Sequence, residues 1–171
     1  MIARNLSSNV THLCDDEIDL WIVQLNRSPI SDSWHLLSAD EQNRAGRFGF
    51  EVDKVCFANG RSALRRIFGG YLDARPESLR FQYNAHGKPE LSQAPEAIPF
   101  NVTHSREIAL IASVRNISIG VDLEAVRNDL SIEDLAEGIL SRRELERFRT
   151  TPPDAQQLEV FKTWVVKEAF P

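Results

Sequence analysis

The chain has 171 residues, of which 42% are hydrophobic and 26% charged, and its formal net charge is −5. These values indicate a globular protein of one domain or two small lobes, and the mild acidity argues against bulk nucleic-acid binding. No apolar run approaches the ~20 residues that cross a bilayer, and the N-terminus lacks the apolar core of a secretory signal. The two cysteines, Cys14 and Cys56, have no metal-type spacing. We therefore expect a cytoplasmic protein that binds neither membranes nor nucleic acids.

The first predicted element is a strand over residues 17–25. Its alternating hydrophobic side chains on one face are Ile18, Leu20 and Ile22. Ser38, with Glu41 three residues later, forms a capping box that predicts the start of a short helix. A long helix is expected next, from about residue 53 to residue 71. The apolar stripe of this helix consists of Phe57, Leu64, Phe68 and Tyr71.

The middle of the chain predicts strands and loops. Residues 79–114 contain turn residues and three prolines, a composition typical of short strands joined by loops. Residues 108–114 and 117–124 are both rich in β-branched side chains and flank a turn at residues 115–116. This arrangement predicts a β-hairpin.

The last fifty residues predict three helical pieces. Capping patterns mark their starts at Ser131 with Asp134, Ser141 with Glu144, and Asp154 with Gln157. The two prolines within residues 150–154 predict a break before the final helix.

One pattern occurs in both halves of the chain. Leu37-Ser38-x-x-Glu41-x-x-Arg44 recurs as Leu140-Ser141-x-x-Glu144-x-x-Arg147. A chance recurrence of a common capping box is one explanation, but the shared order of strand, capped helix and long helix favours a duplication. The predicted fold class is therefore α/β (α+β), with two pseudo-repeated lobes, 1–105 and 106–171. Each lobe would pack a long helix on a small, mainly antiparallel sheet, and the second lobe would be incomplete.

Two carboxylates lie close together in the predicted strand at 117–124. Side chains two residues apart on a strand point to the same side, so Asp122 and Glu124 would project together, roughly 7 Å apart. Their charges repel each other, and a cation would relieve the repulsion. The alternative is a solvated strand edge anchored by Val121 and Leu123.

A third carboxylate falls on the apolar stripe of the last helix. Glu168 follows Leu158, Phe161 and Val165 in steps of three and four residues. A carboxylate on a buried face must be paired, neutralised or bound to a metal. A salt bridge at the helix end would also satisfy it. Taken together, three carboxylates on rigid elements suit Mg²⁺.

Arginine and histidine residues complete the set of candidates. Arg61 lies within the apolar stripe of the long helix, where a guanidinium requires a carboxylate or a ligand phosphate. Arg65 and Arg66 lie farther round the helix and are expected to be solvated. The turn around Lys88 is typical of a surface turn, and a lone histidine such as His104 is usually structural.

Four motifs in succession resemble the signatures of the Sfp-type 4′-phosphopantetheinyl transferases. They are HGKPEL (86–91), FNVTHS (100–105), IGVDLE (119–124) and FKTWVVKEA (161–169). The first long helix is also similar, and the resemblance covers residues 37–171. It implies an enzyme that moves the phosphopantetheine arm of coenzyme A onto a serine of an acyl or peptidyl carrier protein.

The resemblance also implies roles for individual residues. It assigns Mg²⁺ to Asp122, Glu124 and Glu168. It assigns coenzyme A to Lys88, Thr103, His104, Ser105, Lys167 and either Arg61 or Lys54. Glu168 would act as the general base for the incoming serine, and Asp122 would be the second catalytic residue.

The chain departs from the family motif at its end. The family motif reads Lys-Glu-Ala-x-x-Lys, whereas this chain ends at Pro171 and lacks the last lysine. We therefore expect a C-terminally truncated, monomeric member with weak or no activity. A non-catalytic remnant that binds coenzyme A is the main alternative, and an unrelated Mg²⁺-dependent phosphoesterase is another. A local docking patch for an acidic carrier protein is expected among the arginines of residues 61–66 or 142–149.

Overall fold

The computed structural model describes residues 2–4, 13–15, 17–85, 87–92 and 98–170. In chain order the elements are β1 (Ile2–Arg4), β2 (Asp19–Gln24), α1 (Ser31–Trp34), α2 (Ala39–Ala45), α3 (Glu51–Leu72), the 3₁₀ helix η1 (Pro76–Ser78), β3 (Phe81–Tyr83), β4 (Pro89–Leu91), β5 (Phe100–Ser105), β6 (Ile108–Ser113), α4 (Ile132–Ile139), α5 (Arg142–Thr150) and α6 (Pro153–Glu168). None of the described helices is both long and apolar enough to cross a membrane.

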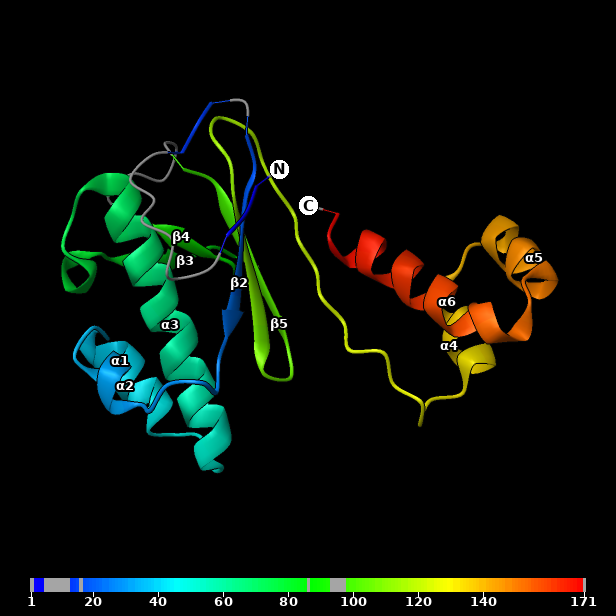
Figure 1. Ribbon diagram of the computed structural model, residues 1–171, viewed down its shortest axis with the longest axis horizontal. Helices are drawn as coiled ribbons and strands as arrows, with labels where there is room; N and C mark the ends of the chain where they lie inside the picture. Colours follow the sequence, from blue (N-terminus) through cyan, green and yellow to red (C-terminus); the bar gives the residue numbers. More distant parts are fainter. Residues whose placement is uncertain (1, 5–12, 16, 86, 93–97, 171) are drawn as a thin grey trace.

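The four-stranded sheet has the order β1-β2-β6-β5, and β3 and β4 form a separate pair. Only β1 and β2 run parallel, and every other described strand pair is antiparallel. Figure 1 shows α3 on one side of this sheet and α4, α5 and α6 on the other, beyond a long connecting segment. The predicted mixed α/β class with a mainly antiparallel sheet is confirmed.

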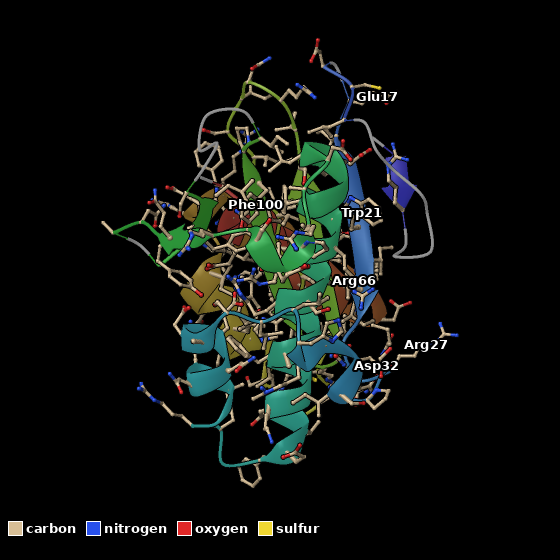
Figure 2. The ribbon with its side chains drawn as sticks, turned by 90° about the vertical axis from the view of Figure 1, so that its left-hand side faces the viewer. Glu17, Trp21, Arg27, Asp32, Arg66 and Phe100 are labelled. Atoms are coloured by element: carbon tan, nitrogen blue, oxygen red, sulfur yellow. The ribbon has the colours of Figure 1, made fainter. Side chains whose placement is uncertain are left out.

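The long helix α3 carries the main core. Three residues of its predicted stripe, Leu64, Phe68 and Tyr71, are buried against the sheet. The fourth, Phe57, is half-buried and packs on Phe48. The Phe68 and Phe100 rings pack with centroids 4.5 Å apart. Figure 2 shows α3 lying in front of the strands, with Trp21 and Phe100 behind its two sides. The capping boxes predicted at the starts of α2 and α5 are also present.

The first predicted strand is confirmed, but its core face is the other one. In β2 the buried side chains are Asp19, Trp21 and Val23, whereas Ile22 is 48% exposed. Both faces of this strand carry hydrophobic side chains, so alternation alone could not identify the core face. The packing of α3 decides it, because Trp21 belongs to the core cluster that α3 covers.

The predicted hairpin of residues 108–114 and 117–124 is wrong in its second strand. β6 pairs with β2 along one edge and with β5 along the other. Neither edge of β6 is therefore open to the following residues. Residues 117–127 instead form an irregular, unpaired segment that leaves the sheet.

The three C-terminal helices form a second, smaller core around Ala136, Phe148 and Val160. After residue 113 the described part of the chain contains no strand, so the predicted second sheet is not seen and the lobe-level repeat stays unconfirmed. The boundary predicted at residues 105/106 stays a proposal, and β6 joins the sheet of the first part.

The N-cap of α6 is Pro152 and not Asp154, which lies in its first turn.

A chain of polar groups crosses the buried side of β2. The Trp21 Nε1–H donates to the Tyr71 hydroxyl, which donates to Asp19 Oδ2, both at 2.7 Å. Arg4 Nε lies 2.7 Å from the other oxygen of Asp19. Burial raises the pKa of Tyr71, and the Asp19 carboxylate adds to this effect, so the hydroxyl keeps its proton as a donor.

Tyr71→Phe is expected to lower the free energy of unfolding by about 1–3 kcal/mol, because it leaves Trp21 Nε1 without an acceptor and Asp19 Oδ2 without a donor in the core. Urea unfolding would measure the loss. Tyr83→Phe is the matched control, since Tyr83 is 44% exposed and its hydroxyl lies a longer 3.4 Å from Arg44. Equal losses in the two variants would contradict this account.

Candidate active site

The acidic segment, residues 118–125, passes beside β5 without strand pairing. Asp122 and Glu124 are both half-buried within it. The spacing of two residues was expected to place them on a strand face, but here their surroundings come from neighbouring loops and from β5. The positions of these carboxylates are therefore set by side-chain contacts.

Thr103 on β5 holds the first of these carboxylates. Its hydroxyl donates to Asp122 Oδ1 at 2.9 Å. The second oxygen, Oδ2, is buried and has no hydrogen-bond partner among the residues that the structure describes. A buried carboxylate oxygen is costly to leave unpaired, so this atom is the strongest single indication of a ligand site.

Two further contacts fasten the acidic segment on either side of Asp122. Lys88 Nζ donates to the Ile119 carbonyl at 3.3 Å. The Ala125 N–H donates to Ser105 Oγ at 3.0 Å. Lys88, Thr103 and Ser105 thus bind the acidic segment at three points, and we call these three side chains the clasp.

An open hollow of about 450 Å³ adjoins the end of the clasp. Its walls come from the β5–β6 turn and from the acidic segment, and they include Ser105, Arg106, Glu124 and Arg127. Two carboxylates, Glu124 and Asp129, also line the hollow, and Arg127 donates to both oxygens of Asp129 at 3.1 and 2.7 Å. Arg106 is therefore the better candidate to bind phosphate oxygens. The sequence interpretation missed Arg106 and Arg127, because both lie just outside the recognised motifs.

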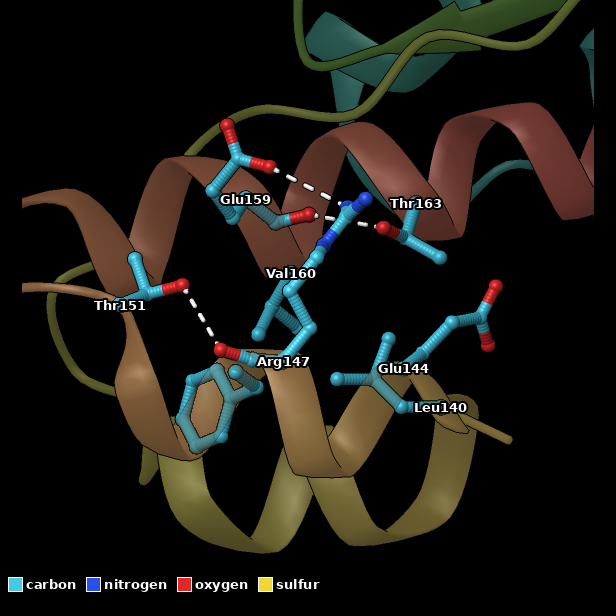
Figure 3. Close-up of a pocket in the computed structure, with 8 residues that line it drawn as sticks. Leu140, Glu144, Arg147, Thr151, Glu159, Val160 and Thr163 are labelled. Carbon is cyan, nitrogen blue, oxygen red and sulfur yellow. Dashed lines mark hydrogen bonds and ion pairs between the residues drawn. The ribbon is translucent and has the colours of Figure 1, made fainter. Parts of the chain in front are cut away.

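A second crevice, between α5 and α6, is too small for a substrate. Figure 3 shows its lining, with the Glu159 carboxylate close to the Arg147 guanidinium and Thr163 beside the Glu159 carbonyl. Its volume is about 10 Å³, room for roughly one water molecule. This crevice is a packing defect between helices.

Comparisons with known proteins identify the family of the chain. Residues 25–116 match the family model described as 4′-phosphopantetheinyl transferase, N-terminal, and residues 118–170 match the 4′-phosphopantetheinyl transferase superfamily. The chain is 38% identical over 162 residues to the 4′-phosphopantetheinyl transferase HetI of Nostoc sp., covering 92% of this chain and 68% of HetI. The chain belongs to the 4′-phosphopantetheinyl transferase family.

Other relatives cover the chain in the same way. A putative 4′-phosphopantetheinyl transferase of Synechocystis sp. is 32% identical, over 88% of this chain and 62% of its own length. The 4′-phosphopantetheinyl transferase psf-1 of Bacillus pumilus is 28% identical, over 84% of this chain and 60% of its own length. The chain thus spans about two thirds or less of the length of these transferases. The Sfp-type subdivision stays a prediction.

The transferase motif on α6 is placed differently from the sequence expectation. Glu168 is exposed, as is Leu158, and of the predicted stripe only Phe161 is buried. The reason is that α6 packs on α4 and α5 through Val160, so its packed face lies elsewhere. Among the described residues, no three His, Cys, Asp or Glu side chains are close enough to hold a metal. The three-carboxylate Mg²⁺ site therefore stays a proposal.

The buried anion required by Arg61 is a carboxylate. Arg61 Nε lies 2.6 Å from Glu41 Oε1, and Arg65 Nε lies 2.8 Å from Glu41 Oε2. The prediction that Arg65 is solvated is wrong, since it is only 1% exposed, while the exposed position of Arg66 is confirmed. Arg66 donates to the Asp32 carbonyl (Figure 2). Arg61 is thus committed to Glu41.

The remaining residues assigned to coenzyme A lie apart from the clasp contacts. Lys54 is 3.3 Å from Glu51 and lies over the Trp34 ring. His104 is exposed and lies on the opposite side of β5 from Thr103. Lys167 Nζ donates to the Ile139 carbonyl and to Glu144 Oε2, at 2.7 and 2.6 Å. The ligand roles of these three side chains stay predictions.

The hydrogen bonds from Lys167 and from the Ser141 backbone lower the pKa of Glu144 to about 2. Glu144 therefore remains charged at neutral pH and ties α6 to the start of α5. This contact gives Lys167 a structural role at the end of α6.

Gly120 brings the acidic segment against the end of α6. A Cβ atom added at this residue would overlap the Ala169 carbonyl oxygen. Only glycine permits this approach of two backbones. Because Ala169 follows Glu168 directly, the contact links the acidic segment to the helix end that carries the proposed general base.

Gly120→Ala is expected to separate these two backbones and to lower stability by about 1–3 kcal/mol, the usual cost of overpacking. Hydrogen exchange at the Ala169 amide, which now donates to Val165, should become faster. Gly138→Ala on α4 is the control, because nothing lies within 4 Å of its added Cβ. In a helix that change should be neutral or stabilising. Unchanged exchange in Gly120→Ala would contradict the contact.

Proposed function

We propose that this chain transfers the 4′-phosphopantetheine arm of coenzyme A to a serine hydroxyl of an acyl or peptidyl carrier protein, with Mg²⁺ held by Asp122, Glu124 and Glu168. The observation that carries the proposal is the buried Oδ2 of Asp122, which has no hydrogen-bond partner among the described residues. A carboxylate oxygen of this kind is the ligand that Mg²⁺ prefers, so Asp122 suits the ion by its chemistry. The proposal requires Glu124 and Glu168 to approach it, because no three such side chains are gathered among the described residues. When bound, the ion would neutralise charge that builds on the diphosphate oxygens.

The residues of the chain would perform the other parts of the reaction. Arg106 would bind phosphate oxygens within the hollow, and Ser105 would donate its hydroxyl proton to one of them. Glu168 would take the hydroxyl proton of the carrier serine. At the same time the serine oxygen would form a bond to the β-phosphorus of coenzyme A, and the bond from that phosphorus to the leaving phosphate oxygen would break. The leaving product is 3′,5′-adenosine bisphosphate. The Gly120–Ala169 contact supports this role for Glu168, because it brings the helix end to the acidic segment.

The carrier protein would dock on exposed arginines. Of the two expected patches, residues 61–66 offer only Arg66, since Arg61 and Arg65 are buried. The patch on α5 keeps its arginines on the surface, with Arg142 and Arg147 both largely exposed. We therefore assign the docking patch to α5.

The experiment is a carrier-modification assay with purified chain, coenzyme A, Mg²⁺ and an acyl carrier protein. The expected result is a carrier whose mass increases by one phosphopantetheine arm, with no increase when EDTA replaces Mg²⁺. Calorimetric titration of coenzyme A distinguishes the alternative of a non-catalytic remnant. Binding without a mass increase would replace the transferase with that remnant, and the exposed position of Glu168 favours the remnant as the second candidate.

A further inference from the structure

Arg106 occupies a backbone conformation that arginine rarely adopts. It is the first residue of the two-residue turn between β5 and β6, which the paired residues Ser105 and Ile108 close. Its φ angle is 54°, in the left-handed region. Glycine is the usual first residue of a hairpin turn with this conformation, because a Cβ atom strains it. An arginine here therefore lowers the stability of the turn.

The other described residues with positive φ are of types that tolerate it. They are Asp73, Gly87 and Asn116. The short side chains of Asp and Asn adopt the left-handed region more readily than long ones, and glycine adopts it freely. Arg106 is thus the exception within the described part of the chain. An exception of this kind points to a role of the side chain.

Contacts within the chain do not explain the arginine. Its guanidinium is exposed and forms no hydrogen bond or ion pair with another described residue. By contrast, Arg127 in the same hollow binds both oxygens of Asp129. These hydrogen bonds lower the pKa of Asp129, and Arg106 adds only a smaller effect of its charge. The Arg106 charge is therefore available to a ligand in the hollow that it lines.

We propose that Arg106 binds the diphosphate of coenzyme A, and that this contact accounts for an arginine in a strained turn. The inference rests on the proposed function and names the phosphate group that enters the hollow. A guanidinium suits phosphate oxygens because its N–H donors bind two of them at once. The Ser105 hydroxyl lines the same hollow and still has its proton, since its oxygen accepts from the Ala125 N–H.

The position of the hollow favours the diphosphate over the 3′-phosphate of coenzyme A. Glu124 and Ala125, at the end of the acidic segment, form part of its wall. The acidic segment is the part of the chain that is proposed to act on the diphosphate. Arg106 and Ser105 would therefore meet the diphosphate from the β5 side.

The test compares Arg106→Gly with wild type by calorimetric titration in EDTA, so that a bound metal ion contributes nothing. The two ligands are coenzyme A and 3′-dephospho-coenzyme A, which lacks the 3′-phosphate and keeps the diphosphate. We expect Arg106→Gly to weaken the binding of both by about 10-fold or more, the usual effect of losing hydrogen bonds to a charged group. Arg106→Lys, which keeps the charge, should lose less.

Thermal unfolding measures the strain in the same variant. Arg106→Gly should raise the midpoint of unfolding by about 2–4 °C, because glycine relieves the left-handed conformation. Asn116→Gly serves as the control, since Asn116 also has a positive φ, 64°, in an exposed turn and does not line the hollow. It should leave the affinity for both ligands unchanged.

The outcomes separate this inference from the proposed function. Wild-type affinity for both ligands in Arg106→Gly, or an equal loss in Asn116→Gly, would overturn the ligand role of Arg106. A loss with coenzyme A alone would assign Arg106 to the 3′-phosphate, against the proposal. A lowered midpoint of unfolding in Arg106→Gly would show that the arginine is structural and would also overturn it. A wild-type chain that binds neither ligand, in EDTA or in Mg²⁺, would overturn the proposed function as well.

Discussion

Glu41→Gln is expected to lower the free energy of unfolding by about 3–5 kcal/mol, the typical cost of breaking a buried ion pair. Glu41 is 2% exposed, and both oxygens of its carboxylate are occupied by arginines. Gln has the same shape and can still accept from the Ser38 N–H, so the helix cap would survive. The loss would come from leaving Arg61 and Arg65 charged and uncompensated in the core. Urea unfolding measures it.

The matched control is Glu144→Gln, because Glu144 occupies the same position in the repeated capping motif. Its oxygen also accepts from the backbone N–H of the capping serine. The difference lies in the surroundings, since Glu144 is partly exposed and pairs with a single lysine. Surface pairs contribute little to stability, so we expect a much smaller loss. Similar losses in the two variants would contradict the importance of the buried arginines.

Acidification should reduce the advantage of wild type over Glu41→Gln. Burial opposes the charge of Glu41, but Arg61, the Ser38 backbone N–H and Arg65 outweigh this effect and lower the pKa of the carboxyl. A group with a lowered pKa in the folded state stabilises the fold above its ordinary pKa of 4.5, and this contribution falls as the pH drops below that value. Unfolding curves recorded from pH 7 to pH 3 should converge. A constant difference would contradict the assignment.

The sequence predicted both members of this ion pair without connecting them. Glu41 was identified as a capping residue and Arg61 as a buried cation in need of an anion. The two are 20 residues apart, and no local pattern reports which surface of α2 faces α3. Arg65 was missed for a related reason. Its guanidinium reaches the Pro76 and Leu79 carbonyls that follow the helix, which only the folded chain places within reach.

The acidic segment shows where periodicity stops being informative. The alternation of Val121 and Leu123 with carboxylates is typical of a strand, and the resemblance to a family singled out the same segment as a candidate site. Strand pairing, however, requires an open edge, and both edges of β6 are occupied. The α6 stripe failed in a similar way. Period alone placed Glu168 on the apolar face, but the helices that cover α6 select a different face.

The clasp explains how an unpaired segment can still hold a site. A segment without strand pairing has lost the usual means of fixing its backbone, and its carboxylates would be free to turn. Three side-chain contacts, from β5 and from the turn before β4, hold the backbone of the acidic segment in place of strand pairing. All three residues lie within the motifs HGKPEL and FNVTHS, which the sequence singled out as ligand contacts. Contact with the acidic segment gives Lys88, Thr103 and Ser105 a structural reason to be present.

Asp122→Asn is expected to reduce carrier modification by about 10²–10³-fold, the size of loss seen when one preorganised electrostatic contact is removed from a reacting centre. The amide keeps the shape of the side chain and an oxygen that can accept from Thr103. It lacks the negative charge at the buried Oδ2 position, so binding of a divalent ion should fail. Mn²⁺ resonance should show this loss independently of turnover, while coenzyme A affinity in EDTA should be retained.

Asp154→Asn provides the control for this substitution, because Asp154 is an exposed carboxylate in the first turn of α6, at the opposite end of that helix from Glu168. It should leave both Mn²⁺ binding and carrier modification unchanged. Thermal unfolding would show whether either substitution disturbs the fold, and we expect Asp122→Asn to be no less stable than wild type, since the unpaired buried charge is removed. An Asp122→Asn chain that binds Mn²⁺ as tightly as wild type would remove Asp122 from the metal site.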